Sequence, residues 1–467
     1  MYLLHKLFEV FGRRVLLLGL LALAMAGHSC KEDVPGPPDT PPVVPPVTPA
    51  AGPVVAPADA VVYEAFVRDF SAAGTFDGML PRLDSIKSLG ANVLWLMPIH
   101  PIGQVKRVGS VGSPYAVRDY LAANPDLGDL AAFDRLVVAA HQRNLTVILD
   151  WVANHTAWDH AWIQQHKDWY TQNAAGVIQT PVPEWQDVAD LNYDRPELRR
   201  EMIRAMRFWV QRHGVDGFRC DAADMVPDSF WKEAIDSLQR VRPNLFLLAE
   251  GGKASHLASG FKLNFGWDFY DALKQVFNQR AGVPTLTASH TREQQGAPAG
   301  RYRLRFTTNH DFSFTEGPAP EIFGSPAAAE AAYVATLAYG ATPLIYNGQE
   351  AGDPARLSLF EKQTISWTAR PATTAFYRRV LRLYHELPAL RTGTITAGTS
   401  PDVVTVLRAT GPQRVAVLVN VRAQPVTLAV PAAWPATSWT NALTGQPVAN
   451  SPTLTLPAHG YAIWRSQ

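Results

Sequence analysis

Asp150-Trp151-Val152-Ala153-Asn154-His155 is one of four short polar stretches in this chain that each close an apolar, β-prone run. The other three are Gly217-Phe218-Arg219-Cys220-Asp221, Leu248-Ala249-Glu250 and Phe306-Thr307-Thr308-Asn309-His310-Asp311. The apolar runs cover residues 146–149, 217–218, 245–249 and 303–307. In a barrel of parallel strands, the residues at the carboxyl ends of the strands converge on one mouth. The spacing therefore predicts that the acids, amides and histidines of these stretches share one site.

Strand-like apolar runs alternate with helix-like stretches from residue 61 onward, and this alternation indicates a parallel α/β architecture. The runs lie at 61–66, 93–97, 146–150, 217–221, 245–250, 263–265, 303–307 and 342–346. Helical periodicity marks residues 130–142, 196–212, 228–240 and 326–339. Eight such units predict a (β/α)8 TIM barrel over residues 58–390. The loop-rich segment 155–194, after the third strand, is predicted to form a short inserted subdomain.

The last part of the chain has a different pattern. A helix is expected at 375–387, followed by short alternating strands at 403–408, 414–419, 426–430 and 461–464. This pattern predicts a C-terminal antiparallel β-sandwich domain over residues 391–467. Its expected role is to shield the flank of the barrel.

The N-terminus predicts export. Basic residues precede an apolar run at 15–25, which is too short to span a bilayer and is typical of a signal peptide. Ala26-Gly27-His28-Ser29-Cys30 resembles a bacterial lipoprotein box, although His28 is irregular for it. Residues 1–30 are therefore expected to be a lipoprotein-type signal peptide, with the lipid on Cys30. An ordinary cleaved signal, and hence secretion, is the alternative.

The segment that follows predicts a spacer. Lys31-Glu32-Asp33 resembles the acidic tag of some surface-exposed bacterial lipoproteins, and residues 31–57 consist largely of Pro, Val, Ala and Thr. Such a composition favours extended polyproline geometry and forbids a packed core. We expect this linker to hold the folded part of an outer-membrane or cell-surface lipoprotein away from the membrane. The protein would then contact the membrane only through its lipid anchor.

The composition is that of a large globular chain with little net charge. Of 467 residues, 47% are hydrophobic and 18% are charged, enough to bury a core in more than one domain. Lysine and arginine (42) nearly balance aspartate and glutamate (41), so a net charge of +1 provides no field for holding nucleic acid. A neutral substrate fits better. The 13 tryptophans and 14 tyrosines offer faces that suit sugar rings, although most are expected in the core.

The chain has two cysteines, Cys30 and Cys220. Cys220 lies between Arg219 and Asp221 on a presumed strand, where side chains alternate between faces. If the arginine and the aspartate point into the barrel, Cys220 points into the helix layer as a buried, inert thiol. A disulfide with Cys30 is not expected, because Cys30 lies beyond the linker.

Placed in order, these segments resemble the α-amylase family of glycoside hydrolases, family 13. The resemblance runs from about residue 61 to the C-terminus. It includes Gly340-Ala341-Thr342-Pro343-Leu344-Ile345-Tyr346-Asn347-Gly348-Gln349-Glu350, which is similar to the family's eighth-strand segment. The resemblance implies a retaining hydrolase whose partner is an α-glucan such as starch or a maltooligosaccharide.

Retaining hydrolysis needs one carboxylate to attack the anomeric carbon and one carboxylic acid to protonate the leaving oxygen. Asp221 stands two residues after Arg219 on one strand face, so the guanidinium is expected to keep it ionised. Glu250 ends a strongly apolar strand, where desolvation favours its protonated form. The resemblance implies that Asp221 is the nucleophile, that Glu250 is the acid/base and that Asp311 binds sugar hydroxyls in the transition state. Structural ion pairs at helix N-termini are the alternative.

The resemblance also implies a set of substrate-binding residues. These are Tyr115, which stacks on the sugar in the cleavage subsite, His155 and His310, which bind its hydroxyls, and Arg219. Asp150 resembles the third-strand aspartate that supports the site. The histidines could instead be satisfied core residues, and Tyr115 could be a packing residue.

A structural calcium ion is expected by resemblance between barrel and inserted subdomain. Asn154, Asp190 and the backbone carbonyl of Met225 match usual ligands, and their oxygen atoms suit a hard cation. A further acidic ligand is not identifiable. Asn154 and Asp190 could also hydrogen-bond the loop directly.

Two features concern specificity. Where many family members carry a Lys-His pair just after the nucleophile segment, this chain has Asp224-Met225, which puts the preference for the leaving group in doubt. Four tryptophans could supply stacking platforms or simply pack the subdomain: Trp151, Trp158, Trp162 and Trp185.

The expected activity is cleavage of internal α-1,4-glucosidic bonds of starch-like glucans by a monomeric, exported α-amylase. A relative specific for maltooligosaccharides, or a glucanotransferase, is the alternative within the family. A non-catalytic glucan-binding lipoprotein is the alternative from another class, since fold alone does not imply function.

Overall fold

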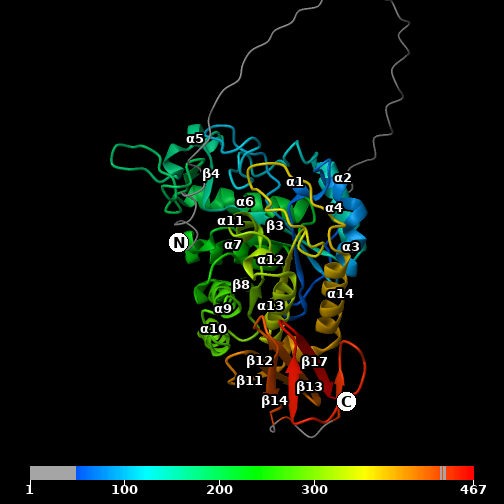
Figure 1. Ribbon diagram of the computed structural model, residues 1–467. Helices are drawn as coiled ribbons and strands as arrows, with labels where there is room; N and C mark the ends of the chain where they lie inside the picture. The colour runs from blue at the N-terminus through cyan, green and yellow to red at the C-terminus, as the bar shows by residue number, and fades with distance from the viewer. Residues whose placement is uncertain (1–48, 432–433, 435–437, 467) are drawn as a thin grey trace, which may run out of the picture. The chain divides into compact units, whose positions relative to one another are not determined.

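The computed structural model describes residues 49–431, 434 and 438–466, and its centre is a closed barrel of eight parallel strands (Figure 1). The order around the barrel is β1-β10-β9-β8-β7-β6-β3-β2. The strands are β1 (Val62–Ala65), β2 (Val93–Leu96), β3 (Thr146–Trp151), β6 (Gly217–Cys220), β7 (Phe246–Ala249), β8 (Leu263–Phe265), β9 (Tyr302–Arg305) and β10 (Thr342–Tyr346). The predicted TIM barrel is confirmed, and the short run at 263–265 is its β8 strand.

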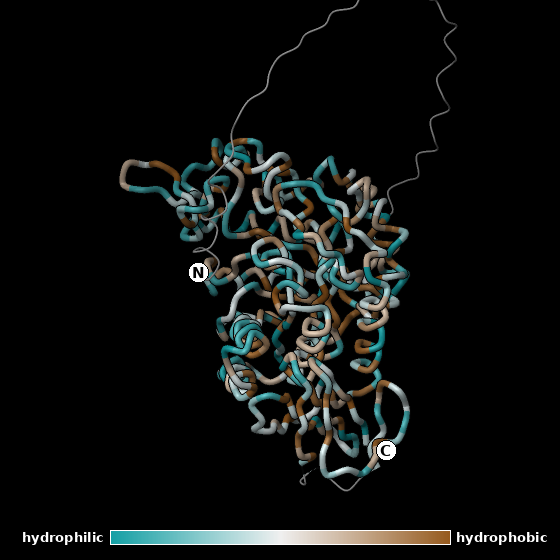
Figure 2. The backbone as a smooth tube through the Cα atoms, viewed as in Figure 1, coloured by the Kyte–Doolittle hydropathy of each residue, from teal (hydrophilic) through white to brown (hydrophobic). Residues whose placement is uncertain are grey.

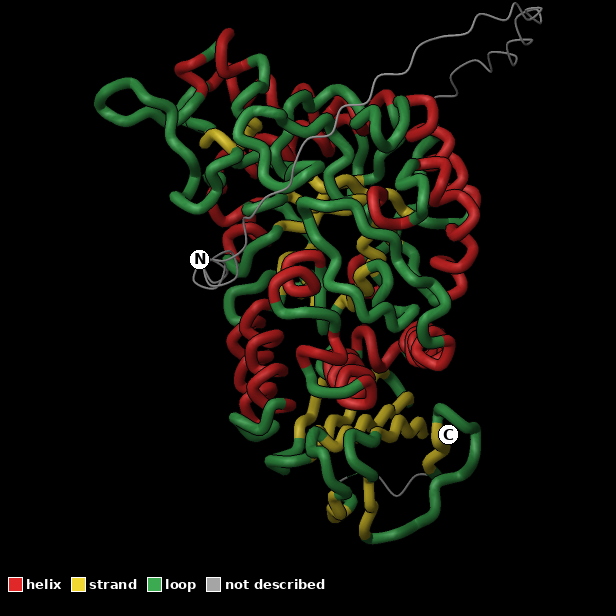
Figure 3. The backbone as a smooth tube through the Cα atoms, turned by 45° about the horizontal axis from the view of Figure 1, so that its top comes forward, coloured by secondary structure: helices red, strands yellow, loops and turns green. Residues whose placement is uncertain are grey.

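Helices cover the outside of this barrel, as Figure 3 shows in red around the yellow strands. The longer ones are α4 (Leu130–Gln142), α6 (Pro196–Arg212), α7 (Asp228–Val241), α9 (Trp267–Phe277), α10 (Pro284–Gln294), α13 (Pro326–Ala338) and α14 (Pro371–Glu386). Their starts have local causes. The Asp129 side chain accepts a hydrogen bond from the Ala132 N–H at the start of α4, and α6 begins on Pro196.

Shorter helices lie mainly in the loops. They are α1 (Val67–Phe70), α2 (Phe76–Met79), α3 (Leu83–Ser88), α5 (Trp162–Gln165), α8 (Ala254–Ser259), α11 (His310–Thr315), α12 (Ala319–Ile322) and α15 (Pro388–Thr392). In the inserted segment after β3, β4 (His155–Ala157) pairs antiparallel with β5 (Val188–Asp190). The pairing sets His155 opposite Asp190.

Close strand contact in the barrel depends on Gly217, the first residue of β6. A Cβ atom added there would lie 1.9 Å from the carbonyl oxygen of Phe246 on β7. Since carbon atoms never approach a backbone oxygen so closely, the site requires glycine. The same strand carries Arg219, which pairs with Asp150 of β3 on one side and Leu248 of β7 on the other.

The C-terminal domain is antiparallel, as expected. One sheet has the order β11 (Thr394–Ala397), β12 (Val403–Thr410), β13 (Gln413–Asn420), β17 (Tyr461–Ser466), β15 (Trp439–Asn441), and the other pairs β14 (Val426–Ala429) with β16 (Thr453–Leu456). Leu418, Leu456 and Trp464 belong to one buried cluster that joins the two sheets. Burial alternates along β14 and β16, whereas β13 is buried without a break from Val415 to Asn420, so both of its faces are covered. Figure 2 colours these strands by hydropathy.

Three further expectations concern single segments. Cys220 is a free, buried cysteine, as expected. The predicted signal sequence, the predicted lipid-bearing Cys30 and the predicted linker up to residue 48 lie outside the described residues. Within the described part of the chain, no helix has the length and apolar character needed to cross a bilayer.

Candidate active site

Three carboxylates from three strand ends meet one guanidinium at the barrel mouth. Nη1 of Arg219 donates to Asp150 Oδ1 at 2.7 Å and to Asp221 Oδ1 at 2.9 Å. Its Nη2 lies 2.7 Å from Glu250 Oε1. The Arg219 side chain is fully buried, so these pairs are held in a low-dielectric setting. The predicted Asp221 and Glu250 are therefore brought together by adjacent nitrogens of a single side chain.

Burial controls the proton affinity of these acids. Burial raises the pKa of Glu250, and the neighbouring Asp221 charge raises it further, whereas Arg219 opposes the shift. Burial also raises the pKa of Asp221, and the ion pair with Arg219 opposes that shift, in the direction that keeps Asp221 ionised. For Asp150, burial outweighs the same arginine and raises the pKa to about 7. The cluster is thus able to retain a proton near neutral pH, as an acid/base site requires.

Ala222 has an unusual backbone conformation directly after Asp221. Its φ is 42°, in the left-handed region that residues with a side chain rarely adopt. In this conformation its N–H donates to Glu250 Oε2 at 2.7 Å. The strained turn therefore fixes one oxygen of Glu250, while Arg219 holds the other. Sequence reasoning did not identify this residue.

The third predicted acid, Asp311, belongs to a second polar group on the same mouth. Its Oδ1 lies 3.4 Å from His310 Nε2, and His310 Nδ1 lies 2.5 Å from Glu64 Oε1 on β1. Burial would lower the pKa of His310, but Asp311 and Glu64 outweigh it and raise the pKa to about 9. His310 is therefore a cation at neutral pH, which balances part of the negative charge of the mouth.

Tyr115 links the two groups. Its hydroxyl is 2.8 Å from His310 Nε2 and donates to Asp150 Oδ2 at 3.1 Å, and its ring stacks on His310 with centroids 5.4 Å apart. His155 also contacts it, through a hydrogen bond with the Tyr115 backbone, and burial lowers the pKa of His155 to about 4. The predicted substrate-binding residues are thus contiguous, with one histidine charged and the other neutral.

Two of the predicted metal ligands, Asn154 and Asp190, lie close together in the inserted segment. Asn154 precedes His155, which pairs with Asp190 across β4 and β5, and the Leu191 N–H donates to the Asn154 carbonyl. Asp190 is half-buried, and burial raises its pKa. Met225 instead ends the short 3-10 helix Ala223–Met225 with its side chain 43% exposed. Among the described residues, no group of three or more His, Cys, Asp or Glu side chains could hold a metal.

The four tryptophans divide between packing and the surface of the site. Trp151 and Trp162 are buried, at 0% and 9% exposure, so neither can serve as a stacking platform. Trp185 is half-buried and lies edge-on to His155, with ring centroids 5.5 Å apart. Trp158 is also half-buried and carries the Lys106 ammonium over its ring. Only the last two remain candidates for sugar contact.

Sequence reasoning missed two buried residues that shape the mouth. Glu64 is the single acid in the apolar run that forms β1, and it holds His310. Trp95 of β2 donates to Asp150 Oδ2 at 3.2 Å, and its ring lies 4.9 Å from the Arg219 guanidinium carbon. The sequence signal for Glu64 was a lone acid in an otherwise apolar strand. No sequence signal distinguished Trp95 from its neighbours, because its run is uniformly apolar.

Asp224, which stands where many family members carry a lysine, contacts a lysine and a histidine that follow Glu250 in the sequence. Lys253 donates from Nζ to the Asp224 carbonyl at 2.7 Å, and His256 Nε2 lies 3.4 Å from Asp224 Oδ1. Glycine at 251 leaves room for this arrangement, since a Cβ there would lie 2.5 Å from Asp224 Oδ1. A lysine is thus present beside Asp224, although it comes from the loop after β7 and not from the segment that the family pattern suggests.

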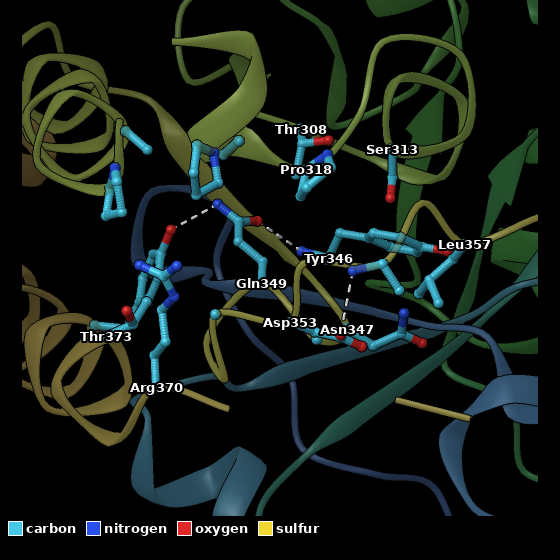
Figure 4. A pocket seen from close by; sticks show the side chains of 18 of the residues that line it. Thr308, Ser313, Pro318, Tyr346, Asn347, Gln349, Asp353, Leu357, Arg370 and Thr373 are labelled. Atoms are coloured by element: carbon cyan, nitrogen blue, oxygen red, sulfur yellow. Dashed lines mark hydrogen bonds between the residues drawn. The ribbon is translucent and has the colours of Figure 1, made fainter. Parts of the chain in front are cut away.

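The cavity in Figure 4 lies beside this site, between β10 and α14, and is too small for a sugar. Its volume is about 30 Å³, room for a few water molecules, since one needs about 10–15 Å³ by this measure. Gln349 spans it, donating to Tyr377 Oη at 2.7 Å and to Thr307 Oγ1 at 2.8 Å. Its Oε1 accepts a hydrogen bond from the Tyr346 N–H (Figure 4). This cavity is a packing feature behind the barrel wall.

Comparison with known proteins agrees with this geometry. The sequence matches the family described as "Alpha amylase, catalytic domain" over residues 61–188 and 183–374. Alpha-amylase MalA of Haloarcula japonica is 30% identical over 396 residues, 80% of this chain and 57% of that protein. An alpha-1,4-glucan:maltose-1-phosphate maltosyltransferase of Cereibacter sphaeroides is 36% identical over 197 residues, 38% of this chain and 33% of that protein. The chain thus spans only part of the length of both relatives.

A solved structure matches over nearly its whole length. An alpha-amylase from Lactobacillus plantarum has a TM-score of 0.80 and 30% identity, over 88% of this chain and 99% of that one. The family match covers more than half of the present sequence and includes β6 and β7, whose ends carry Asp221 and Glu250. On these grounds the chain belongs to the alpha-amylase family.

Proposed function

We propose that this protein is a monomeric retaining hydrolase that cleaves internal α-1,4-glucosidic bonds of starch-like glucans. One observation carries the proposal: Asp221 and Glu250 contact adjacent nitrogens of the Arg219 guanidinium. Such an arrangement favours the short separation of about 5–5.5 Å between carboxyls that retaining enzymes use, over the longer one of inverting enzymes.

The proposed reaction has two steps. A carboxylate oxygen of Asp221 bonds to the anomeric carbon while the bond to the glycosidic oxygen breaks, and Glu250 gives its proton to that oxygen. Glu250, now ionised, then takes a proton from a water molecule, whose oxygen attacks the same carbon and releases Asp221. The pKa of Glu250, raised by burial, favours the protonated form needed at the start.

Substrate orientation would fall to the second polar group. Tyr115 and His310 present an aromatic face and hydrogen-bonding atoms side by side, a combination suited to one sugar ring. Asp311 lies within reach of the same hydroxyl groups and would bind them more tightly as the ring distorts. This positioning is expected to raise the rate without any direct part in bond breaking.

The test is digestion of amylose by the full chain, following loss of iodine colour and gain of reducing ends together. Fast colour loss per reducing end supports internal cleavage, and Asp221→Asn serves as the inactive control. Slow colour loss with steady sugar release would contradict internal cleavage. Binding to insoluble starch without any release would favour a non-catalytic glucan-binding protein.

A second candidate is a relative that acts on short maltooligosaccharides or transfers the glycosyl group. Asp224, at the position of the family lysine, together with Lys253 beside it, favours this candidate because the leaving-group side is altered. The partial match to a protein named as a maltosyltransferase points the same way. Initial rates on maltotriose and on amylose, with product analysis for chains longer than the substrate, separate the candidates.

Calcium binding is a further proposal. Asn154, Asp190 and the Met225 carbonyl supply three oxygen atoms, whereas Ca²⁺ takes six to eight, so water would complete such a site. The ion's contribution would be to tie β5 to the barrel. Chelation with EDTA should then lower the melting temperature of the protein, added Ca²⁺ should restore it, and Asp190→Ala should abolish both effects. An unchanged melting temperature on chelation would exclude the site.

We also propose that the protein is exported and anchored through a lipid on Cys30. The supporting pattern is the lipoprotein-like sequence Ala26-Gly27-His28-Ser29-Cys30 after an apolar run. Expression of the full chain in a bacterium that processes lipoproteins should place it in the membrane fraction, whereas Cys30→Ala should leave that fraction. Equal distribution of both chains in the soluble fraction would favour ordinary secretion.

A further inference from the structure

A second cavity, broadly open to solvent, lies at the opposite end of the barrel, between the amino-terminal ends of β9 and β10 and the C-terminal domain. Its volume is about 300 Å³, the lower end of the range for small-molecule sites. The barrel contributes residues from α10, the start of β9 and Gly340, and the C-terminal side contributes residues around α15, β11 and β12. Figure 1 shows α10 and β11 side by side at this junction.

The lining of this cavity is basic. It includes Arg301, Arg391, Arg408 and His290, and it includes no aspartate or glutamate. The other lining residues are Gln294, Tyr302, Gly340, Thr392, Gly393 and Ile395. Three guanidinium groups around one cavity repel one another unless counter-charges are present.

Arg408 shows this imbalance most clearly. It is 1% exposed, and its nitrogens donate to two backbone carbonyls, Ala338 at 3.0 Å and Gly393 at 2.9 Å, at the ends of α13 and α15. Burial lowers its pKa to about 10, so the group remains charged at neutral pH. Within the described part of the chain it has no carboxylate partner, and its Nε has no acceptor. Helix-end carbonyls offset part of a buried charge, but less than an anion does.

The backbone is adapted to keep this arginine in place. Gly340 has a φ of +64°, and a Cβ there would lie 2.4 Å from Arg408 Nη1. Any side chain at this position would therefore collide with the guanidinium. Burying the Arg408 charge without an anionic partner lowers the free energy of unfolding. An anion bound in the adjoining cavity would offset that loss.

The other basic residues present hydrogen-bond donors. Arg301 takes part in no ion pair among the described residues, and Arg391 pairs with Asp59, which lies outside the lining. His290 Nδ1 lies 3.1 Å from Arg305 Nη2, and because a guanidinium can only donate, the imidazole proton must sit on Nε2. The lining thus combines three cations with a neutral N–H donor, which is the chemistry of an oxyanion site.

We propose that this cavity binds a phosphate-type dianion, either inorganic phosphate or the phosphoryl group of a small sugar phosphate. Guanidinium groups match the paired oxygens of such an anion, and the cavity exceeds the size of a halide. Because the lining comes from both the barrel and the C-terminal domain, the bound anion holds the two domains together. The proposal is independent of the activity at the barrel mouth.

The test is isothermal titration of the full chain with inorganic phosphate at constant ionic strength, together with melting curves at each concentration. We expect saturable binding and a melting temperature that rises to a plateau. Arg301→Gln, which breaks no ion pair, should weaken binding at least tenfold. Arg391→Lys, which keeps the charge beside Asp59 but loses the planar fork, is a second variant should the first fail to fold.

The matched control is Arg200→Gln, which removes an exposed arginine on α6 and should bind phosphate like the wild type. An equal, unsaturating rise in all proteins would show a general salt effect and overturn the proposal, as would the absence of heat in the wild type. Titrations with glucose 1-phosphate and with glucose distinguish inorganic phosphate from a sugar phosphate as the preferred ligand. Tighter binding of glucose 1-phosphate that Arg301→Gln weakens supports a sugar phosphate, and equal binding of plain glucose contradicts a phosphate site.

Discussion

Single side chains set the proton balance of the barrel mouth. Arg219 contacts Asp150, Asp221 and Glu250, and His310 contacts Glu64 and Asp311, so two buried cations face five carboxyls, of which Glu250 and Asp311 are half-buried. Two cations cannot neutralise five carboxylates, and burial raises the pKa of each acid. This charge count favours a proton held within the group of acids, and burial raises the pKa of Glu250 in the direction that its role as the acid needs.

Replacing Glu250 with glutamine tests the assigned acid. Glu250→Gln keeps the shape and the contact with the Ala222 N–H but cannot donate a proton, so the rate on amylose should fall by about 10²–10⁴-fold. Glu233→Gln on the outer face of α7, which loses only an exposed pair with Arg199, is the matched control. Full activity of Glu250→Gln would refute the role.

The charge of His310 predicts a dependence of stability on pH. Its pKa rises from 6.5 to about 9 on folding, so its stabilising effect is complete below pH 6.5 and lost as pH rises through 9. The difference in unfolding free energy between wild type and His310→Gln should therefore shrink over this range, by about 3 kcal/mol at most. Urea unfolding of both proteins at pH 6 and pH 9.5 measures it. A difference that stays constant would contradict a charged His310.

Among the elements, β6 connects sequence to site most directly, because it carries Arg219 and leads into Asp221 and the left-handed Ala222. Its position depends on Gly217. Gly217→Ala would push β6 from β7 and should lower the unfolding free energy by about 3 kcal/mol or more. Gly252→Ala is the control, since its Cβ would meet only Trp267 at 3.8 Å. Similar melting temperatures for both variants would show that the strands can separate without cost.

The elements also show what the sequence could predict. Barrel strands were predictable because they are short β-prone runs that alternate with helical stretches, and only β2, β7 and β10 lack a charged residue or an asparagine. Asp221 and Glu250 could be found because each follows directly on such a run. β11 and β16 were missed, since most of their residues are not buried and leave no apolar pattern. The pairing of Glu64 with His310 could not be predicted, because 246 residues separate them. Nor could the turn at Ala222, whose conformation is rare for alanine.

At the scale of the whole molecule, the C-terminal domain supplies donors to the barrel. Arg408 donates to Ala338 O, Arg422 donates to Val276 O, and the ring of Tyr461 contacts Phe376. A chain ended at residue 390 loses all three contacts. The Val276 carbonyl keeps the Gln279 N–H, whereas the Ala338 carbonyl loses the Arg408 donor, at a cost of about 1–3 kcal/mol. We expect such a chain to melt well below the full protein, or to aggregate on purification. An unchanged melting temperature would show that the barrel is stable alone.

The shared guanidinium of Arg219 has a consequence for how this sequence can diverge. Because one side chain satisfies acids from β3, β6 and β7, the loss of any one acid changes the environment of the other two. Substitutions at these positions are therefore expected to be strongly non-additive, and descendants of this chain should keep or lose them together. Substitutions that the active site tolerates are then confined to residues outside this set, such as Asp224 and Lys253. Changes there can alter substrate specificity while the contacts between Arg219 and its three acids are kept.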